Sequence, residues 1–357
     1  MKLISKVLAL TLAVCMVISL AACHPKDEVA FSSGESKITS AMYSACLIQA
    51  FSDATEKVAE DTTVQITKQE DYFDQTIDKM PFADWVLKTA KNYANTFVYL
   101  DKLEKDGTIA LTEDQESEVV SAVTSQWASY SAIYDLNGVS QATYTKFLRY
   151  GYLKEQYFES IYGAKGTSPV SQDEQDKYYN TNFVLVHALS DNFTNAQTGA
   201  AYTDDEKAAA KTKFENYEKE LKKGSRKFDA IYKEFYNVTP EVEQSMKNDK
   251  IKDVYAQVIG SKNTGDDYKD DNFAAVQAMK VGETKIINSD SGIILYERLD
   301  INSDPYYKTE LSASILHLLK DEEFEKTLET KATELGVKEN TYATGVFTPK
   351  GIKFPEQ

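Results

Sequence analysis

The sequence changes character at Phe183-Val184-Leu185-Val186-His187-Ala188-Leu189, a short and nearly continuous apolar run. Such a run, bounded by polar segments, predicts a buried strand. Before it, apolar residues recur every three or four positions, as on the buried faces of helices. After it, short helical patterns alternate with short strand patterns. The loop from Gly163 to Pro169 is therefore the expected boundary between an all-helical part and a mixed part.

The part before the boundary predicts four long helices over residues 39–162. They are expected to begin at Thr39 or Ser40, near Pro81, at Thr112 and at Ser140. Proline suits a first helical turn, and Thr112 with Gln115 has the spacing of a capping box. Aromatic residues dominate the apolar stripes of the last two helices: Trp127, Tyr130, Tyr134, Tyr144, Phe147 and Phe158.

The mixed part predicts a small α+β domain with an antiparallel sheet. Ser171 with Glu174 and Thr203 with Glu206 are expected to cap helices, and residues 285–287 and 293–299 are expected strands. A strongly amphipathic helix then runs to Gly336, and the N-terminal helical domain is its expected cover. The predicted fold class is thus helix-rich α+β, with the small domain inserted into a helical domain. The predicted segments are a leader (1–22), helical domain (23–168), inserted domain (169–301) and returning C-terminal helix (302–357).

The N-terminus predicts an exported protein. Lys2 and Lys6 precede the apolar stretch 7–20, which is too short to span a bilayer comfortably. Leu20-Ala21-Ala22-Cys23 resembles a bacterial lipobox, which implies lipidation of Cys23 and location on the outer face of the cell membrane. Two acyl chains would anchor the chain firmly. The alternative is an ordinary signal peptide cut elsewhere, with Cys23 incidental.

Composition excludes several functional classes. The net charge of −16 argues against nucleic-acid binding, which needs clustered basic residues. Of the three cysteines, Cys15 would leave with the leader and Cys23 would be lipidated. Cys46 would then stand alone, so no intramolecular disulfide is expected.

The sequence contains few residues and no common motifs for metal binding, cofactor binding or nucleophilic catalysis. The sequence has three histidines and lacks the H-E-x-x-H, C-x-x-C, G-x-S-x-G, S-x-x-K and phosphate-loop patterns. The acidic cluster 266–271 lacks the spacing and glycine of a calcium loop and is expected to be solvated. We therefore expect neither a metal nor a cofactor.

The order of these landmarks resembles the extracytoplasmic foldases of the PrsA and SurA type. In that family a helical chaperone domain is assembled from both ends of the chain and accompanies a parvulin-type prolyl isomerase domain. The resemblance is carried by five segments: residues 29–39, 170–189, 222–235, 281–283 and 290–295. It implies an α+β insertion of parvulin type and unfolded or newly exported polypeptides as partners.

The sequence departs from the parvulin pattern at the cleft. Parvulins carry two cleft histidines; His187 matches the first, whereas Ile294 stands at the second. The family's glycine-rich stretch is not recognisable between Asn237 and Asn272, no cysteine or aspartate is assignable to the third polar position, and Phe273 is a candidate apolar cleft residue only. The resemblance therefore implies His187 as a catalytic candidate and weak or absent peptidyl-prolyl isomerase activity. The alternative is a buried His187 whose ring is satisfied by the backbone.

Three functions follow from these observations. The leading hypothesis is a lipid-anchored, ATP-independent holding chaperone or foldase, whose apolar and aromatic surfaces cover unfolded segments. The 23 tyrosines suit such surfaces, although each is also accounted for as a core residue. The second is a non-catalytic envelope scaffold that reuses the fold. The third, a solute-binding lipoprotein, fits badly because such proteins usually have parallel sheets. Substrate-contact residues are not assigned, and a homodimer through the helical domain stays open.

Overall fold

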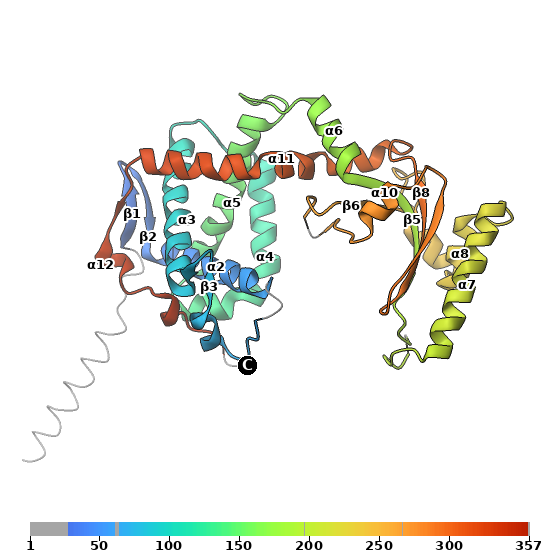
Figure 1. Ribbon diagram of the computed structural model, residues 1–357. Helices are drawn as coiled ribbons and strands as arrows, with labels where there is room; N and C mark the ends of the chain where they lie inside the picture. The colour runs from blue at the N-terminus through green and yellow to red at the C-terminus, as the bar shows by residue number, and fades with distance from the viewer. Residues whose placement is uncertain (1–27, 61–63, 196, 266, 356–357) are drawn as a thin grey trace, which may run out of the picture. The chain divides into compact units, whose positions relative to one another are not determined.

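The computed structural model describes residues 28–60, 64–195, 197–265 and 267–355, which form two compact units (Figure 1). The first unit takes in the chain up to residue 161, residues 165–167 and the chain from residue 322 on. The second unit comprises residues 162–164 and 168–321. The expected leader 1–22 and Cys23 lie outside the described residues.

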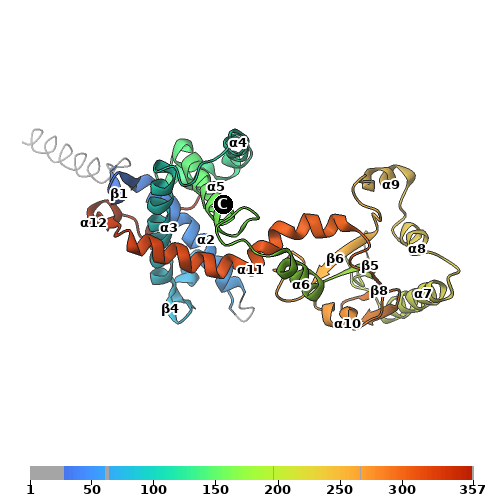
Figure 2. The same cartoon turned by 90° about the horizontal axis from the view of Figure 1, so that it is seen from above.

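The first unit is built on long helices whose caps match the sequence pattern. They are α2 (Ser40–Ala59), α3 (Phe82–Lys105), α4 (Glu113–Leu136) and α5 (Gln141–Tyr162). Thr39 Oγ1 accepts a hydrogen bond from Met42 N at the start of α2, and the Thr112–Gln115 capping box forms at the start of α4. Helices α2 and α3 lie side by side (Figures 1 and 2). Their apolar faces share a core that includes Phe51, Phe82 and Val98.

Short strands join the two ends of the described chain. β1 (Val29–Ser33) pairs with β2 (Ser36–Thr39) on one side and with β9 (Lys338–Glu339) on the other, all antiparallel. Smaller elements complete the unit: η1 (Gln69–Asp74), β3 (Thr76–Ile77), β4 (Met80–Pro81), α12 (Thr341–Thr344) and η2 (Pro349–Gly351). The residues after 335 therefore belong to the same core as the first helix.

Arg149 links three of the long helices through ion pairs. Its guanidinium on α5 donates to both carboxylate oxygens of Glu104 on α3, at 2.5 and 2.9 Å. It also donates to Glu116 on α4, at 2.6–3.1 Å. Forked pairing of this kind is directional as well as strong. Arg149 thus fixes three helices, two of which line the groove described below.

The second unit contains a four-stranded antiparallel sheet in the order β6-β5-β8-β7. The strands are β5 (Phe183–Asp191), β6 (Ala256–Gly260), β7 (Thr284–Asn288) and β8 (Ile293–Leu299). The helices are α6 (Gln172–Asn182), α7 (Asp204–Lys223), α8 (Phe228–Phe235), α9 (Pro240–Met246) and α10 (Phe273–Gln277). Leu189, Ile293 and Leu295 pack against α7 and α8, whereas Val184 and Val186 pack with α10. The two sheet faces are therefore covered by different helices.

Helix-rich α+β, the predicted fold class, is confirmed, and so is the buried strand at 183–189. The structure adds β6, α9 and α10, which the sequence analysis did not assign. The helix expected to start at the Ser171–Glu174 cap is α6, and it runs to Asn182. β6 was missed because it is short and ends at Gly260, where a Cβ would collide with the Thr264 side chain.

Helix α11 (Pro305–Glu334) contributes to both cores. Leu311 and Ile315 in its first half pack with Tyr179 and Phe183 of the second unit. Phe324 in its second half meets Phe158 of the first unit edge to face, with 5.1 Å between ring centroids. The first unit, the expected cover of this helix, packs on its second half, and the second unit packs on its first half. The boundary between the two units falls between residues 321 and 322.

Candidate functional site

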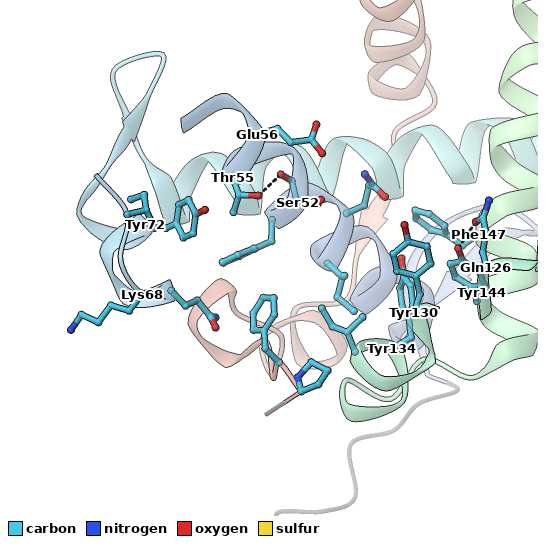
Figure 3. A pocket seen from close by; sticks show the side chains of 18 of the residues that line it. Ser52, Thr55, Glu56, Lys68, Tyr72, Gln126, Tyr130, Tyr134, Tyr144 and Phe147 are labelled. Carbon is cyan, nitrogen blue, oxygen red and sulfur yellow. Dashed lines mark hydrogen bonds between the residues drawn. The ribbon is translucent and has the colours of Figure 1, made fainter. Parts of the chain in front are cut away.

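A groove of about 940 Å³ is hollowed into the first unit (Figure 3). Its lining comes from α2, residues 66–69 and 72, α4, α5 and the C-terminal residues Phe354 and Pro355. Its lining is mostly apolar and aromatic: Ile48, Phe51, Ile66, Tyr72, Tyr130, Ile133, Tyr134, Tyr144, Phe147, Leu148, Phe354 and Pro355. We refer to this hollow as the aromatic groove.

The α4–α5 wall of the aromatic groove is a packed set of rings with one exposed member. Tyr134 and Tyr144 are buried, with ring centroids 4.7 Å apart, and the Tyr144 hydroxyl donates to Gln126 Oε1 at 2.8 Å. Tyr130 is 50% exposed. Burial raises the pKa of Tyr134, so this phenol stays neutral at physiological pH. The wall therefore offers aromatic rings with polar hydroxyl tips.

The α2 wall is built on Phe51. Its ring meets Tyr72 at 6.2 Å, Phe82 at 5.2 Å and Phe354 at 5.3 Å between centroids. Charged side chains lining the groove are few, and Glu56 and Lys68 carry opposite signs. The lining contains no cysteine or histidine that could serve as nucleophile or base. The apolar and aromatic part of the lining gives the groove a surface on which an apolar segment can pack.

A second, smaller pocket of about 480 Å³ surrounds His187 in the second unit. His187 Nδ1 lies 2.8 Å from Glu297 Oε2, and Nε2 lies 2.8 Å from Asp253 Oδ2. The imidazole stacks on the Phe228 ring, with centroids 4.3 Å apart and planes inclined by 14°. Since each ring nitrogen faces a carboxylate, the geometry favours the imidazolium form, in which both nitrogens donate.

Electrostatics favour the same protonation state of His187. Burial of the ring opposes its charge, but the hydrogen bonds and charges of Glu297 and Asp253 outweigh burial and raise the pKa of His187. The ring is 9% exposed and both nitrogens are occupied. His187 therefore has no free hydrogen-bonding atom for a substrate. The expectation that the backbone satisfies a buried His187 is wrong, because side chains do so.

Ile294, at the position of the family's second histidine, does not meet His187. On β5, His187 pairs with Glu297 across the ladder, whereas Ile294 pairs with Ser190. Ile294 packs with the cluster that contains Phe273, on the α10 side of the sheet. Glu297 and Ile294 are an odd number of residues apart and so project to opposite faces. The structure therefore does not bring positions 187 and 294 together.

Sequence reasoning missed the partners of His187 and the whole aromatic groove. Asp253 lies in the stretch left unassigned between Asn237 and Asn272. The sequence does mark Glu297, since an acidic residue in a mostly apolar strand requires a partner. The aromatic stripes on α4 and α5 were recognised, but their convergence with α2 and residues 66–72 depends on tertiary packing.

Among the described residues, no group of three or more histidine, cysteine, aspartate or glutamate side chains is arranged so that it could hold a metal ion. Within the same part of the chain, no helix has the length and apolarity required to cross a bilayer.

Fold and site together define a helix-rich α+β protein with an aromatic groove in its first unit and a four-stranded sheet in its second. No family model matches the sequence, and no curated protein matches it. Among solved structures, the chain is similar to foldase protein PrsA from Streptococcus pneumoniae, with 14% identity and a TM-score of 0.39. That match covers 80% of this chain and 97% of the other. A match to PrsA from Bacillus subtilis has 15% identity, a TM-score of 0.30 and coverage of 71% and 88%. Both structures carry the name of the foldase type that the sequence resembles.

Proposed function

We propose that the protein is a lipid-anchored, ATP-independent folding factor that holds unfolded segments of exported polypeptides in the aromatic groove. The observation that carries this proposal is the groove itself, which is wide and in which apolar and aromatic side chains outnumber the polar and charged ones. Its volume is in the range of sites that enclose several side chains. An exposed apolar surface of this kind marks a binding site for an apolar partner.

The chemistry of the groove suits transient binding. Aromatic walls give contact area without requiring a particular client sequence, and tyrosine hydroxyls can hydrogen-bond to a client backbone. Glu56 and Lys68 oppose one another in sign, so the groove imposes little charge selection. The holding function needs neither nucleotide nor cofactor.

Loss of prolyl isomerase activity is part of the proposal. An isomerase has to bind the twisted amide more tightly than the planar one. His187 has both nitrogens committed to Glu297 and Asp253, and position 294 lies on the other face of the sheet. Neither position can then contribute a polar group to a shared proline cleft.

Tyr130→Ala tests the groove. Tyr130 is 50% exposed on α4 and lines the groove, so we expect this variant to bind a permanently unfolded protein about three- to tenfold more weakly, as for loss of a central aromatic contact. The measurement is fluorescence anisotropy with labelled, reduced and carboxymethylated lysozyme. Light scattering during dilution of an unrelated denatured protein gives the loss of holding activity in parallel.

Tyr342→Ala is the matched control for Tyr130→Ala. Tyr342 is 73% exposed on the first unit and does not line the groove, so its removal should leave binding unchanged. Equal binding by wild type and Tyr130→Ala would contradict the groove as client site. Binding to one envelope protein, without suppression of aggregation, would favour the scaffold instead.

Cys23→Ser tests the anchor. We expect the variant to shift from the membrane fraction to the soluble fraction and to lose incorporation of a labelled fatty acid, because the acyl chains would have no thiol to attach to. Cys15→Ser, inside the expected leader, is the control and should keep both properties. Retention of Cys23→Ser in the membrane fraction would refute a lipid anchor at this position.

A further inference from the structure

The chain places one of its own segments at the end of the aromatic groove. Residues 352–355 follow η2, and Ile352 is buried in the first unit. Lys353, Phe354 and Pro355 are exposed beyond it, yet Phe354 and Pro355 line the groove. Ile352 has extended backbone angles, with φ −64° and ψ 125°. The segment therefore leaves the buried core at Ile352 with extended backbone and reaches the groove at Phe354 and Pro355.

Asn137 binds the main chain of this segment just before the segment reaches the aromatic groove, in a separate hollow of about 260 Å³ that Asn137, Ile352 and Lys353 line. Its Nδ2 donates to Lys353 O at 2.8 Å, and its Oδ1 accepts from Lys353 N at 2.9 Å. The amide is held in place, since Nδ2 also donates to Ile133 O and Ser44 Oγ donates to Asn137 O. These bonds use only backbone atoms of Lys353, so any residue except proline could make both.

Phe51 receives the next side chain. Its ring meets that of Phe354 at 5.3 Å, inclined by 54°, and Phe354 nevertheless remains 37% exposed. Two main-chain hydrogen bonds and one ring contact hold the segment beyond Ile352, a small set compared with a buried core residue. Such a segment can be displaced without disturbing the core.

We propose that Asn137 and Phe51 form a subsite for the main chain and one apolar side chain of an extended polypeptide, and that Lys353 and Phe354 fill it until a client displaces them. This inference rests on the proposed function, because it assumes that clients enter the aromatic groove. It adds that part of the client is bound through its backbone. It also makes the chain's own segment a competitor that keeps client binding weak and reversible.

Phe354→Ala tests the competition. With the chain from His24 onward and the labelled, carboxymethylated lysozyme as probe, we expect the variant to bind about two- to tenfold more tightly, the range for loss of one aromatic contact by the competitor. Removal of residues 354–357 should have the same effect. This truncated variant replaces Phe354→Ala in the test if the point variant is poorly folded. Tyr342→Ala is the control and should not change the affinity.

Asn137→Leu in the Phe354→Ala background tests the main-chain subsite. We expect this double variant to bind more weakly than Phe354→Ala, because the client backbone loses its amide partner. Equal affinities would overturn the subsite. Unchanged or weaker binding by Phe354→Ala, with Tyr130→Ala still weakened, would show that Phe354 is a wall of the groove and would overturn the competition alone. Unchanged binding by Tyr130→Ala would instead refute the groove as client site, and the inference with it.

Discussion

Replacement of His187 by glutamine should lower the free energy of unfolding of the second unit by about 1–3 kcal/mol at pH 6. The range lies below that for a fully buried pair, because the Asp253 side chain is 42% exposed and Glu297 is 24% exposed. The substitution removes an imidazolium that donates to two carboxylates, and it removes a ring stacked on Phe228. It therefore leaves Glu297 and Asp253 facing one another without a cation between them.

The destabilisation caused by His187→Gln should decrease as the pH rises. The pKa of His187 is raised in the folded state, so the folded protein binds a proton more tightly than the unfolded chain. This stabilisation is complete below the ordinary histidine pKa of about 6.5 and is lost as pH rises through the folded-state pKa. The wild-type free energy of unfolding should therefore fall over that interval, and His187→Gln should not show this fall.

Other charges near His187 do not reverse the direction in which the free energy of unfolding changes with pH. Arg226, Lys227 and Asp229 also line the pocket. Arg226 is itself engaged by Glu220 and Glu234, and Lys233 lies 3.7 Å from Asp229. The carboxylates that contact the ring directly, Glu297 and Asp253, remain its nearest partners.

Urea unfolding between pH 5 and 9, followed by backbone amide signals of the second unit, measures the effect. The ring signal of His187, identified by its absence in His187→Gln, gives the folded-state pKa directly. His317→Gln is the control, since His317 is more exposed and lies on α11 beside Asp321. Unfolding curves for wild type and His187→Gln that keep a constant separation across this range would contradict the linkage.

The sequence predicted those features that depend on neighbouring residues. The capping boxes at Thr112 and Thr203 form because the two partners are three residues apart, and the strand at 183–189 is specified by its own apolar run. The His187 site joins residues 66 and 110 positions apart. No local sequence pattern predicts these contacts of His187, because they depend on the register between β5 and β8 and on the path of residues 247–255.

The aromatic groove was beyond sequence reasoning for a related reason. The stripes on α4 and α5 show that Tyr130, Tyr134 and Tyr144 share helix faces, which is equally expected of core residues. Only the tertiary packing distinguishes core tyrosines from exposed ones: it leaves Tyr134 and Tyr144 buried and Tyr130 half exposed. The contribution of Phe354 depends in turn on the Asn137 contact with Lys353.

The slow, proline-limited refolding phase of an unrelated protein should keep its rate when the chain from His24 onward is added at substoichiometric amounts. Uncatalysed isomerisation takes tens to hundreds of seconds because the barrier is about 18–20 kcal/mol. A catalyst must lower that barrier through groups that contact the twisted amide. In the second unit both nitrogens of His187 are already bound to carboxylates, and Ile294 lies on the opposite sheet face.

The yield in the same refolding experiment should rise, because the aromatic groove covers apolar segments before they aggregate. Tyr130→Ala should lose most of this gain without changing the rate, which separates holding from catalysis. A known prolyl isomerase added in parallel confirms that the slow phase is limited by proline. Acceleration by the wild-type chain would contradict the loss of isomerase activity, and its disappearance in His187→Gln would then assign catalysis to the second unit. An unchanged refolding rate with no gain in refolding yield would contradict the chaperone function and favour the scaffold.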